Sequence, residues 1–348
     1  MIPQTDPKAA YHERKAEIDA AISRVLESGR YILGPEVEGF EQEFAAYAGV
    51  RHAVAVASGT DALILALRAL GIGPGDAVIT VSHTAVATVA AVELVGAMPV
   101  LVDVDVCHGL DPEKLAATLA AWPSGAPKPK AIIPVHLYGQ PAAMNEIMAI
   151  AEQHGLAVLE DNSQAHGATL DGTMVGRFGR IAAYSLYPTK NLGAIGDGGI
   201  VATDDPELTT ALKELREYGW RERYVSAIAG MNSRLDPLQA AILRVKLSPL
   251  TRPGAEPVYH QYVVEAPGRR DALQAALRER GVGTLVHYPV PVHLQPAYKG
   301  RVPLGAGGLP RTEAAALAVL SLPMFPQLAD AQMEQVIAAI RDAWRQAA

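Results

Sequence analysis

The sequence predicts an α/β protein with a large domain, built on a mostly parallel sheet covered by helices, and a smaller α+β domain at the carboxyl end. Short, almost entirely apolar runs alternate with helical patterns from residue 51 to residue 203, as in parallel strands that are covered on both faces. Beyond residue 250 the pattern changes: residues 258–264 alternate in side-chain character as in a strand, and a helical pattern and a second strand pattern follow. At 348 residues the chain is also long for one core. We therefore expect an amino-terminal helical segment over 1–30, a large domain over 31–245 and a small domain over 246–348.

The composition argues against several classes of protein. A net charge of −7, without Lys and Arg clusters interleaved with aromatic residues, argues against nucleic-acid binding and favours a small-molecule partner. The longest apolar runs, such as 64–67 and 88–92, are far shorter than the roughly 20 residues that span a bilayer, so no membrane association is expected. The charged first 30 residues show no signal peptide, which makes the cytoplasm the expected compartment. Cys107 is the single cysteine, so neither a disulfide nor a metal site is predicted.

Apolar periodicity and breaking residues predict the elements in order. Two amphipathic helices, over 6–28 and 37–48, come first. In the large domain the expected strands are 52–58, 77–81, 99–104, 131–135, 155–160, 181–186 and 200–203. The helices among and after them are 61–70, 86–96, 111–121, 144–154, 206–218 and one that opens at Asp236-Pro237. In the small domain we expect strands 258–264 and 283–288, a helix over 270–280 and a terminal helix over 330–345.

Three polar elements follow apolar strands of the predicted sheet. Ser58-Gly59-Thr60 stands between a strand and a helix, where backbone N–H groups can bind phosphate, but plain helix capping is favoured on this evidence alone. Asp161 ends another strand, at the edge where parallel sheets bind ligands, and a cap or turn aspartate is an equal alternative. Lys190 follows the strand 181–186 and precedes four glycines. A lone loop lysine is usually a solvated charge, so its meaning depends on the other two elements.

Together the three elements meet the requirements of pyridoxal 5′-phosphate. A lysine holds the aldehyde as a Schiff base, a carboxylate keeps the ring nitrogen protonated, and N–H donors hold the phosphate. An ionised acid beside the nitrogen keeps the ring cationic, so that it can accept the electrons left when the substrate's α-proton departs. The sequence therefore predicts this cofactor, with Lys190 and Asp161 as catalytic residues.

Four segments match more than this general scheme. They are Ala57-Ser-Gly-Thr-Asp-Ala-Leu63, Glu160-Asp-Asn-Ser-Gln-Ala-His-Gly-Ala168, Tyr187-Pro-Thr-Lys-Asn-Leu-Gly-Ala194 and Asn232-Ser-Arg-Leu-Asp-Pro-Leu-Gln-Ala-Ala241. With these motifs in this order, the chain from about residue 31 to its end resembles the DegT/DnrJ/StrS family of pyridoxal-phosphate-dependent nucleotide-sugar aminotransferases. The resemblance implies the aspartate aminotransferase-like (type I) fold.

The resemblance also implies roles for individual residues. Lys190 would be the Schiff-base lysine and proton shuttle, and Asp161 would pair with the ring nitrogen. Gln164 would lie near the ring hydroxyl, and Asn232 would reach the phosphate from the other subunit of a homodimer with shared active sites. The cofactor-binding residues implied are Gly59, Thr60, Ala85, Asp161, Gln164, Ser185, Lys190 and Asn232. The substrate-binding residues implied are Asn191, His287, Tyr288 and His293, although His and Tyr before prolines are as often packing residues.

Two features depart from the family's pattern. The family commonly stacks a bulky ring on the cofactor two residues after the position of His83, where this chain has Ala85. Stacking contributes roughly 0.5–1.5 kcal/mol beyond area burial, so its loss should weaken cofactor retention, and His83 is the candidate substitute. The second feature is the short join from Leu247 to Pro253. Either the chain has a real deletion or residues are missing from the sequence as given; the second is favoured, since about ten residues span at most ~35 Å.

The leading hypothesis is an aminotransferase that moves an amino group from an amino acid, with L-glutamate expected, to a nucleotide-linked keto-deoxysugar. The segment His287-Tyr-Pro-Val-Pro-Val-His293 resembles relatives that act on 3-keto sugars. The family's dehydratase branch has histidine in place of the lysine, so Lys190 argues against it. A non-catalytic regulatory or ligand-binding relative of the same fold is the other alternative.

Overall fold

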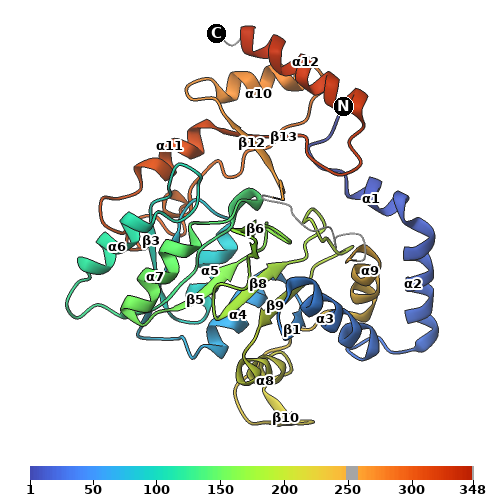
Figure 1. Cartoon of the computed structure of the whole chain (residues 1–348), viewed down its shortest axis with the longest axis vertical. Coiled ribbons are helices and arrows are strands. Elements are labelled where there is room, and N and C mark those ends of the chain that lie inside the picture. The colour runs from blue at the N-terminus through green and yellow to red at the C-terminus, as the bar shows by residue number, and fades with distance from the viewer. Residues whose placement is uncertain (248–257, 347–348) are drawn as a thin grey trace.

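The computed structural model describes residues 1–247 and 258–346, and a seven-stranded sheet organises its large domain (Figure 1). The strand order is β1-β9-β8-β5-β4-β2-β3, and β9 is antiparallel to both of its neighbours while the other pairs are parallel. The mostly parallel sheet predicted from the sequence is therefore confirmed, with β9 as the exception. The strands are β1 (His52–Val56), β2 (Asp76–Val81), β3 (Met98–Val102), β4 (Lys128–Ile132), β5 (Ala157–Asp161), β8 (Ile181–Ser185) and β9 (Gly199–Thr203).

Helices cover both faces of this sheet. Alternate residues of a strand point to opposite faces, so Ile181 and Ala183 join one apolar cluster while Ala182 and Tyr184 join another. This two-sided burial explains why the strands are apolar almost throughout. One face is covered by α4 (Gly59–Ala69), α5 (Val86–Leu94) and α8 (Pro206–Leu215), and the other by α3 (Pro35–Ala48), α6 (Pro112–Ala120), α7 (Met144–His154) and α9 (Pro237–Leu247).

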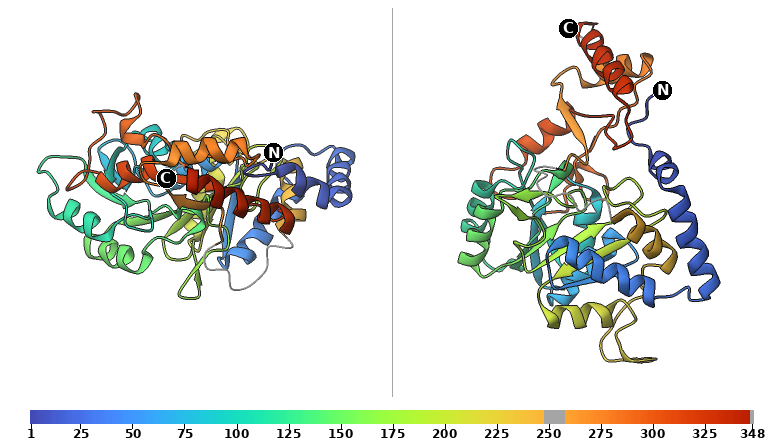
Figure 2. Two further views of the ribbon diagram at one scale, coloured as in Figure 1. Left: turned by 90° about the horizontal axis from the view of Figure 1, so that it is seen from above. Right: turned by 45° about the vertical axis from the view of Figure 1, so that its right-hand side comes forward.

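The amino-terminal segment runs along one side of the molecule and joins its two parts. The single helix predicted over 6–28 is interrupted at Arg14, which separates α1 (Pro7–Glu13) from α2 (Lys15–Ser28). Before α1, Ile2 is buried and pairs with Val282 of the small domain. Figure 2 shows this segment descending from the small domain to the side of α3 and α9.

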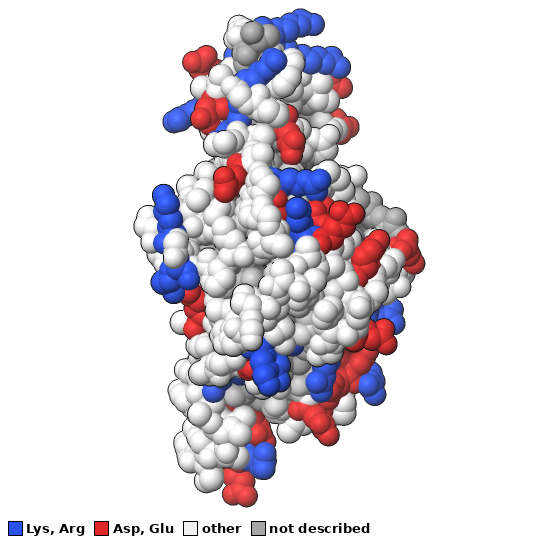
Figure 3. All heavy atoms as spheres, turned by 90° about the vertical axis from the view of Figure 1, so that its left-hand side faces the viewer, with Lys and Arg blue, Asp and Glu red and all other residues white. Residues whose placement is uncertain are grey.

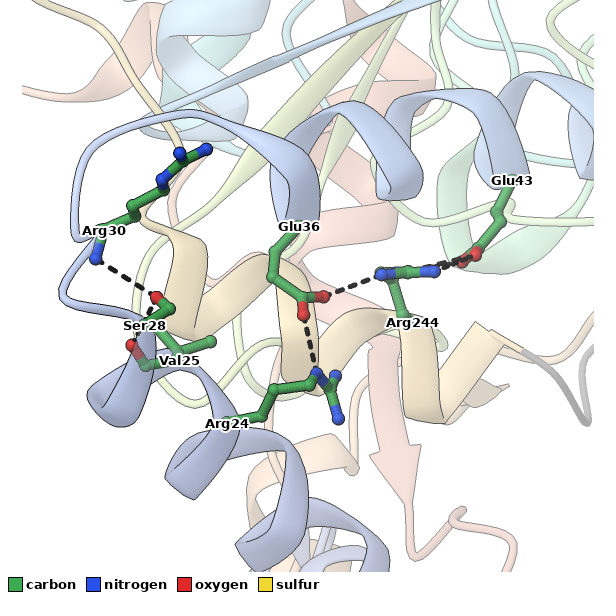
Figure 4. A network of polar contacts seen from close by, with 7 residues as sticks. All are labelled: Arg24, Val25, Ser28, Arg30, Glu36, Glu43 and Arg244. Carbon is green, nitrogen blue, oxygen red and sulfur yellow. Dashed lines mark hydrogen bonds and ion pairs between the residues drawn. The ribbon is translucent and has the colours of Figure 1, made fainter.

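Charged side chains link α2, α3 and α9 where the amino-terminal segment meets the large domain (Figure 4). Glu36 of α3 lies between two guanidinium groups, 2.8 Å from Arg24 of α2 and 2.7 Å from Arg244 of α9. Arg244 also pairs with Glu43 at 2.7 Å. The shared partners make this a network rather than isolated surface pairs, which individually contribute little to stability.

The small domain differs from the prediction in its strands. β12 (Tyr262–Glu265) pairs antiparallel with β13 (Val319–Leu322), and α10 (Arg270–Glu279) and α12 (Asp330–Gln346) pack against this pair. The strand predicted over 283–288 is wrong: only Leu285 pairs, in a single bridge with Ser321. The segment leaves the sheet there, because the backbone of His287 bonds to the large domain instead. The strand predicted to begin at residue 258 begins at Tyr262, since 258–261 hydrogen-bond to Tyr138 and Gly139.

Several short elements had no sequence prediction. They are the hairpins β6 (Thr169–Leu170) with β7 (Thr173–Met174) and β10 (Trp220–Glu222) with β11 (Val225–Ser226), the 3-10 turns η1 (Leu137–Gly139) and η3 (Val292–Leu294), and α11 (Pro310–Ala318). The join whose length departs from the family falls on 248–257 and lies outside the described residues.

None of the helices in 1–247 and 258–346 combines the length and apolar character needed to cross a membrane. On the face shown in Figure 3, basic and acidic side chains are interspersed around a broad uncharged area.

Candidate active site

The predicted phosphate turn lies where β1 passes into α4. The Ser58 hydroxyl caps α4 by accepting a hydrogen bond from Asp61 N at 3.0 Å, as the capping interpretation predicts. This cap still leaves the N–H groups of Gly59 and Thr60 at the open, positive end of an eleven-residue helix. A Cβ added to Gly59 would stand 2.5 Å from Ser185 Cβ, so the turn packs directly on the end of β8. Capping and phosphate binding are therefore compatible here.

Asp161 is buried at the carboxyl end of β5 and held by two donors. The Thr88 hydroxyl donates to Oδ2 at 2.8 Å, and Ser163 N donates to Oδ1 at 3.1 Å. Thr84 and Thr88 hydroxyls are 3.2 Å apart. Because Thr88 gives its one proton to Asp161, Thr84 must be the donor in that pair, and the two hydroxyls form a chain that ends on the carboxylate.

The residue before Asp161 fixes the end of the strand from the opposite side. Glu160 is fully buried and accepts hydrogen bonds from the backbone N–H groups of Gly176, Phe178 and Gly179 at 2.6–2.9 Å. His136 Nε2 lies 3.2 Å from the same carboxylate. Since successive strand residues point to opposite faces, these bonds hold the backbone that aims Asp161 at the site.

Lys190 follows β8 and is half-buried beside Asp161. Burial lowers its pKa to about 8, and the nearby Asp161 charge opposes that shift. The charge of Lys190 in turn acts with burial to lower the pKa of His166 to about 3 and to lower the pKa of His260 and His287. The amine therefore stands among neutral imidazoles, with a substantial uncharged fraction near neutral pH.

Gln164 links the large domain to the small-domain loop. Its Oε1 accepts a hydrogen bond from Tyr138 N at 2.8 Å, and its Nε2 donates to the Tyr288 hydroxyl at 3.0 Å. The Tyr138 hydroxyl donates to the backbone oxygen of His287 and lies 2.9 Å from His83 Nε2. The structure thus brings the predicted residues Gln164, His287 and Tyr288 to one place.

The remaining predicted residues are spread around this centre. Ala85 is the half-buried residue that precedes α5, three residues before Thr88. Asn191 donates to Val258 O at 3.2 Å, and Asn232 is exposed. His293 is buried with Nδ1 2.8 Å from the Ser82 hydroxyl and Nε2 3.2 Å from Glu313, so both of its ring nitrogens have partners within the chain. Its part in substrate binding stays a prediction.

Sequence reasoning missed several residues that support or surround the predicted site residues. Thr88 and Tyr138 were not singled out, although Thr88 is the second threonine of the segment Thr84-Ala-Val-Ala-Thr88 around the predicted Ala85. His166 and His260 were also missed, and no pattern around them indicates that they approach Lys190. His83, the candidate substitute for the missing stacking ring, is fully buried and held by Tyr138.

The residues present fit pyridoxal phosphate. The Gly59 turn offers N–H groups suited to the phosphate at the amino end of α4, the buried Asp161 suits the ring nitrogen, and Lys190 supplies an amine of lowered pKa. The fold and this site define a type I pyridoxal-phosphate enzyme.

Comparison with known proteins narrows the class. The model of the DegT/DnrJ/EryC1/StrS aminotransferase family matches residues 12–256 and 249–341, and the chain belongs to that family.

Relatives match along nearly the whole chain. The chain is 48% identical to the dTDP-3-amino-3,4,6-trideoxy-alpha-D-glucose transaminase of Streptomyces venezuelae, over 98% of this chain and 96% of that protein. It is 46% identical to the erythromycin biosynthesis sensory transduction protein EryC1 of Saccharopolyspora erythraea, over 98% and 99%. The crystal structure of S. venezuelae DesV superposes with a TM-score of 0.91 at 49% identity, covering 98% of each chain. The two segments of the family match overlap over residues 249–256, at the short join.

Proposed function

We propose that this protein transfers an amino group from L-glutamate to a nucleotide-linked 3-keto-deoxysugar. The observation that carries the reaction type is the Lys190 amine, with a pKa of about 8, beside the buried Asp161 and the Gly59 turn. The name of the S. venezuelae relative, which specifies a 3-amino sugar, supports the position of the keto group. The hydrogen bonds of His287 O with Tyr138 and of the Tyr288 hydroxyl with Gln164 support a sugar site on that loop.

Each residue has a distinct task in this scheme. Pyridoxal phosphate, when bound, supplies an electrophilic aldehyde and an electron-accepting ring. The Gly59 and Thr60 N–H groups and the Ser185 hydroxyl would hold the phosphate. Thr88 and Ser163 hold the Asp161 carboxylate, which would pair with the ring nitrogen of the bound cofactor. Lys190 Nζ would remove the α-proton of the amino-acid donor in the first half-reaction and protonate the former keto carbon of the sugar in the second, and an amine with a pKa near 8 is suited to both tasks near neutral pH.

The assembly and compartment belong to the same proposal. Asn232 is exposed in the single chain, and we infer that it reaches the phosphate in a second subunit of a homodimer. The expected compartment is the cytoplasm.

The test is turnover with defined substrates. The protein is loaded with pyridoxal phosphate and incubated with glutamate and a panel of dTDP- and UDP-linked 3-keto and 4-keto sugars, and the products are identified by mass spectrometry. We expect an amino sugar from a 3-keto member. Product from 4-keto members alone would contradict the position assigned, and no product from any member would contradict the activity.

Two variants test the roles of the residues. Lys190→Ala should abolish both turnover and the near-visible absorption band of the bound cofactor. Asp161→Asn should keep folding and the absorption band while turnover falls by on the order of 10²-fold or more, because the ring nitrogen loses its charged partner. A band that survives in Lys190→Ala, or wild-type turnover in Asp161→Asn, would refute the assignment.

A regulatory function is the second candidate, and the name of the S. erythraea relative favours it. A protein of that kind keeps the fold and binds the cofactor without turning over sugars. It would be supported if the wild-type protein shows the absorption band of the bound cofactor, which Lys190→Ala removes, yet converts neither glutamate nor any sugar in the panel.

A further inference from the structure

Tyr138 occupies a turn that touches two separate segments of the carboxyl-terminal part of the chain. It lies in η1, just after β4, with a left-handed φ of 62° that is uncommon for a tyrosine. Its carbonyl oxygen accepts a hydrogen bond from Gln261 N at 3.2 Å, and its hydroxyl donates to the oxygen of His287. The next residue, Gly139, has a φ of 93°, and an added Cβ would stand 2.9 Å from His260 N. The turn is therefore pressed directly against the segment 258–261.

The protons of this cluster can be assigned from its hydrogen bonds. The Tyr138 hydroxyl has one proton, which it donates to His287 O. His83 Nε2, 2.9 Å from the same hydroxyl, must then be the protonated nitrogen and donate to it. Burial, with a contribution from His108, lowers the pKa of His83 to about 4, so His83 stays neutral and keeps this arrangement over the physiological range of pH. The Tyr138 hydroxyl thus accepts a hydrogen bond from His83 and donates its own proton to the backbone oxygen of His287.

The same turn reaches the loop by a second route. Tyr138 N donates to Gln164, and Gln164 donates to the hydroxyl of Tyr288. His287 and Tyr288 are adjacent in the chain. Tyr138 therefore holds this pair twice: directly through His287 O, and through Gln164 at the Tyr288 hydroxyl. Tyr138 is 8% exposed and Gln164 is 5% exposed, so water competes little for these bonds.

We propose that Tyr138 is a positioning residue that, with His83 and Gln164, fastens the His287–Tyr288 segment over the active site and so sets the affinity for the sugar substrate. The proposal rests on the proposed function in assigning sugar binding to this segment. Gln164 is also the residue expected at the cofactor ring. These hydrogen bonds therefore connect Gln164, on the cofactor side of the site, with His287 and Tyr288, on the substrate side.

Tyr138→Phe tests the proposal because it removes one hydroxyl and keeps the ring that fills the turn. In the full-length, cofactor-loaded protein, hydrogen exchange of the peptide covering 285–290 should accelerate about five- to tenfold, the factor that corresponds to one buried hydrogen bond. With dTDP-3-amino-3,4,6-trideoxy-α-D-glucose and 2-oxoglutarate as substrates, KM for the amino sugar should rise by a similar factor. The rate of the half-reaction with glutamate should stay within about twofold of wild type.

The matched control is Tyr11→Phe, which removes a hydroxyl that bonds Asp19 in the amino-terminal helices, 3.0 Å away. It should leave both exchange over 285–290 and KM unchanged. Wild-type exchange over 285–290 in Tyr138→Phe would overturn the proposal. So would equal acceleration throughout the small domain with an equal loss in the glutamate half-reaction, since that result indicates general loosening. The exchange measurement needs no substrate, so it decides the role of Tyr138 even if no sugar is turned over.

Discussion

The hydrogen bond from Thr88 to Asp161 is the contact whose removal has the most direct expected effect on the site. Thr88→Val keeps the size and branching of the side chain and deletes the hydroxyl that lies 2.8 Å from Asp161 Oδ2. Thr88 is 1% exposed and Asp161 is 3% exposed, so water cannot easily replace the lost donor. The change also leaves the Thr84 hydroxyl without the oxygen to which it donates.

The size of the effect follows from the kind of bond. A hydrogen bond to a charged group contributes about 1.5–3 kcal/mol net, so the free energy of unfolding at pH 7 should fall by that amount. If the same bond orients Asp161 during turnover, kcat should fall by about 10- to 100-fold. Cofactor should still bind, because Lys190 and the Gly59 turn are unchanged.

A double-mutant cycle separates the bond from other consequences of the change. Unfolding in urea and steady-state kinetics are measured for Thr88→Val, Asp161→Asn and the double variant, and we expect a coupling free energy of at least about 1 kcal/mol. Thr210→Val is the control, since its hydroxyl bonds Pro206 O on the exposed side of α8 and its loss should change stability by less than about 0.5 kcal/mol. Additive effects of the two substitutions, or a kcat within twofold of wild type, would refute the reasoning.

Two further predictions concern cofactor capture. Only the uncharged form of Lys190 can react with the cofactor aldehyde. The rate at which the cofactor-free protein captures pyridoxal phosphate, followed by absorbance, should therefore rise with pH and level off at high pH. The midpoint of this rise should lie near 8, the lowered pKa of Lys190. A midpoint near 10, as for an ordinary lysine, would contradict the role of burial. Gly59→Ala places a Cβ 2.5 Å from Ser185 Cβ, so the turn must move and the dissociation constant for the cofactor should rise by about tenfold or more in a fluorescence titration. Gly73→Ala, where an added Cβ would stand 3.6 Å from Val95 O, is the control, and equal affinities in the two variants would show that the turn does not hold the phosphate.

The sequence alone determined the large-domain elements and the principal residues of the candidate site. Strands buried on both faces are almost entirely apolar, and this local property revealed part of every strand of the main sheet, although β4 begins at the polar Lys128 and not at Ala131. Asp161, Lys190 and the Gly59 turn could be placed at the same edge because the carboxyl ends of parallel strands meet there. Motif order then named the family, which the family match confirms. These conclusions needed only short-range patterns and the general geometry of parallel sheets.

The tertiary structure decided the contacts between distant segments. Thr88 meets Asp161 across 73 residues, Gln164 meets Tyr288 across 124, and Tyr138 meets His287 across 149. No periodicity records such pairs, because each depends on how whole elements pack. The same cause explains the wrong strand over 283–288: its residues alternate as in a strand, but the backbone of His287 finds its partner on the large domain. Local patterns therefore determined which groups carry the chemistry, and long-range packing determined what holds them in place.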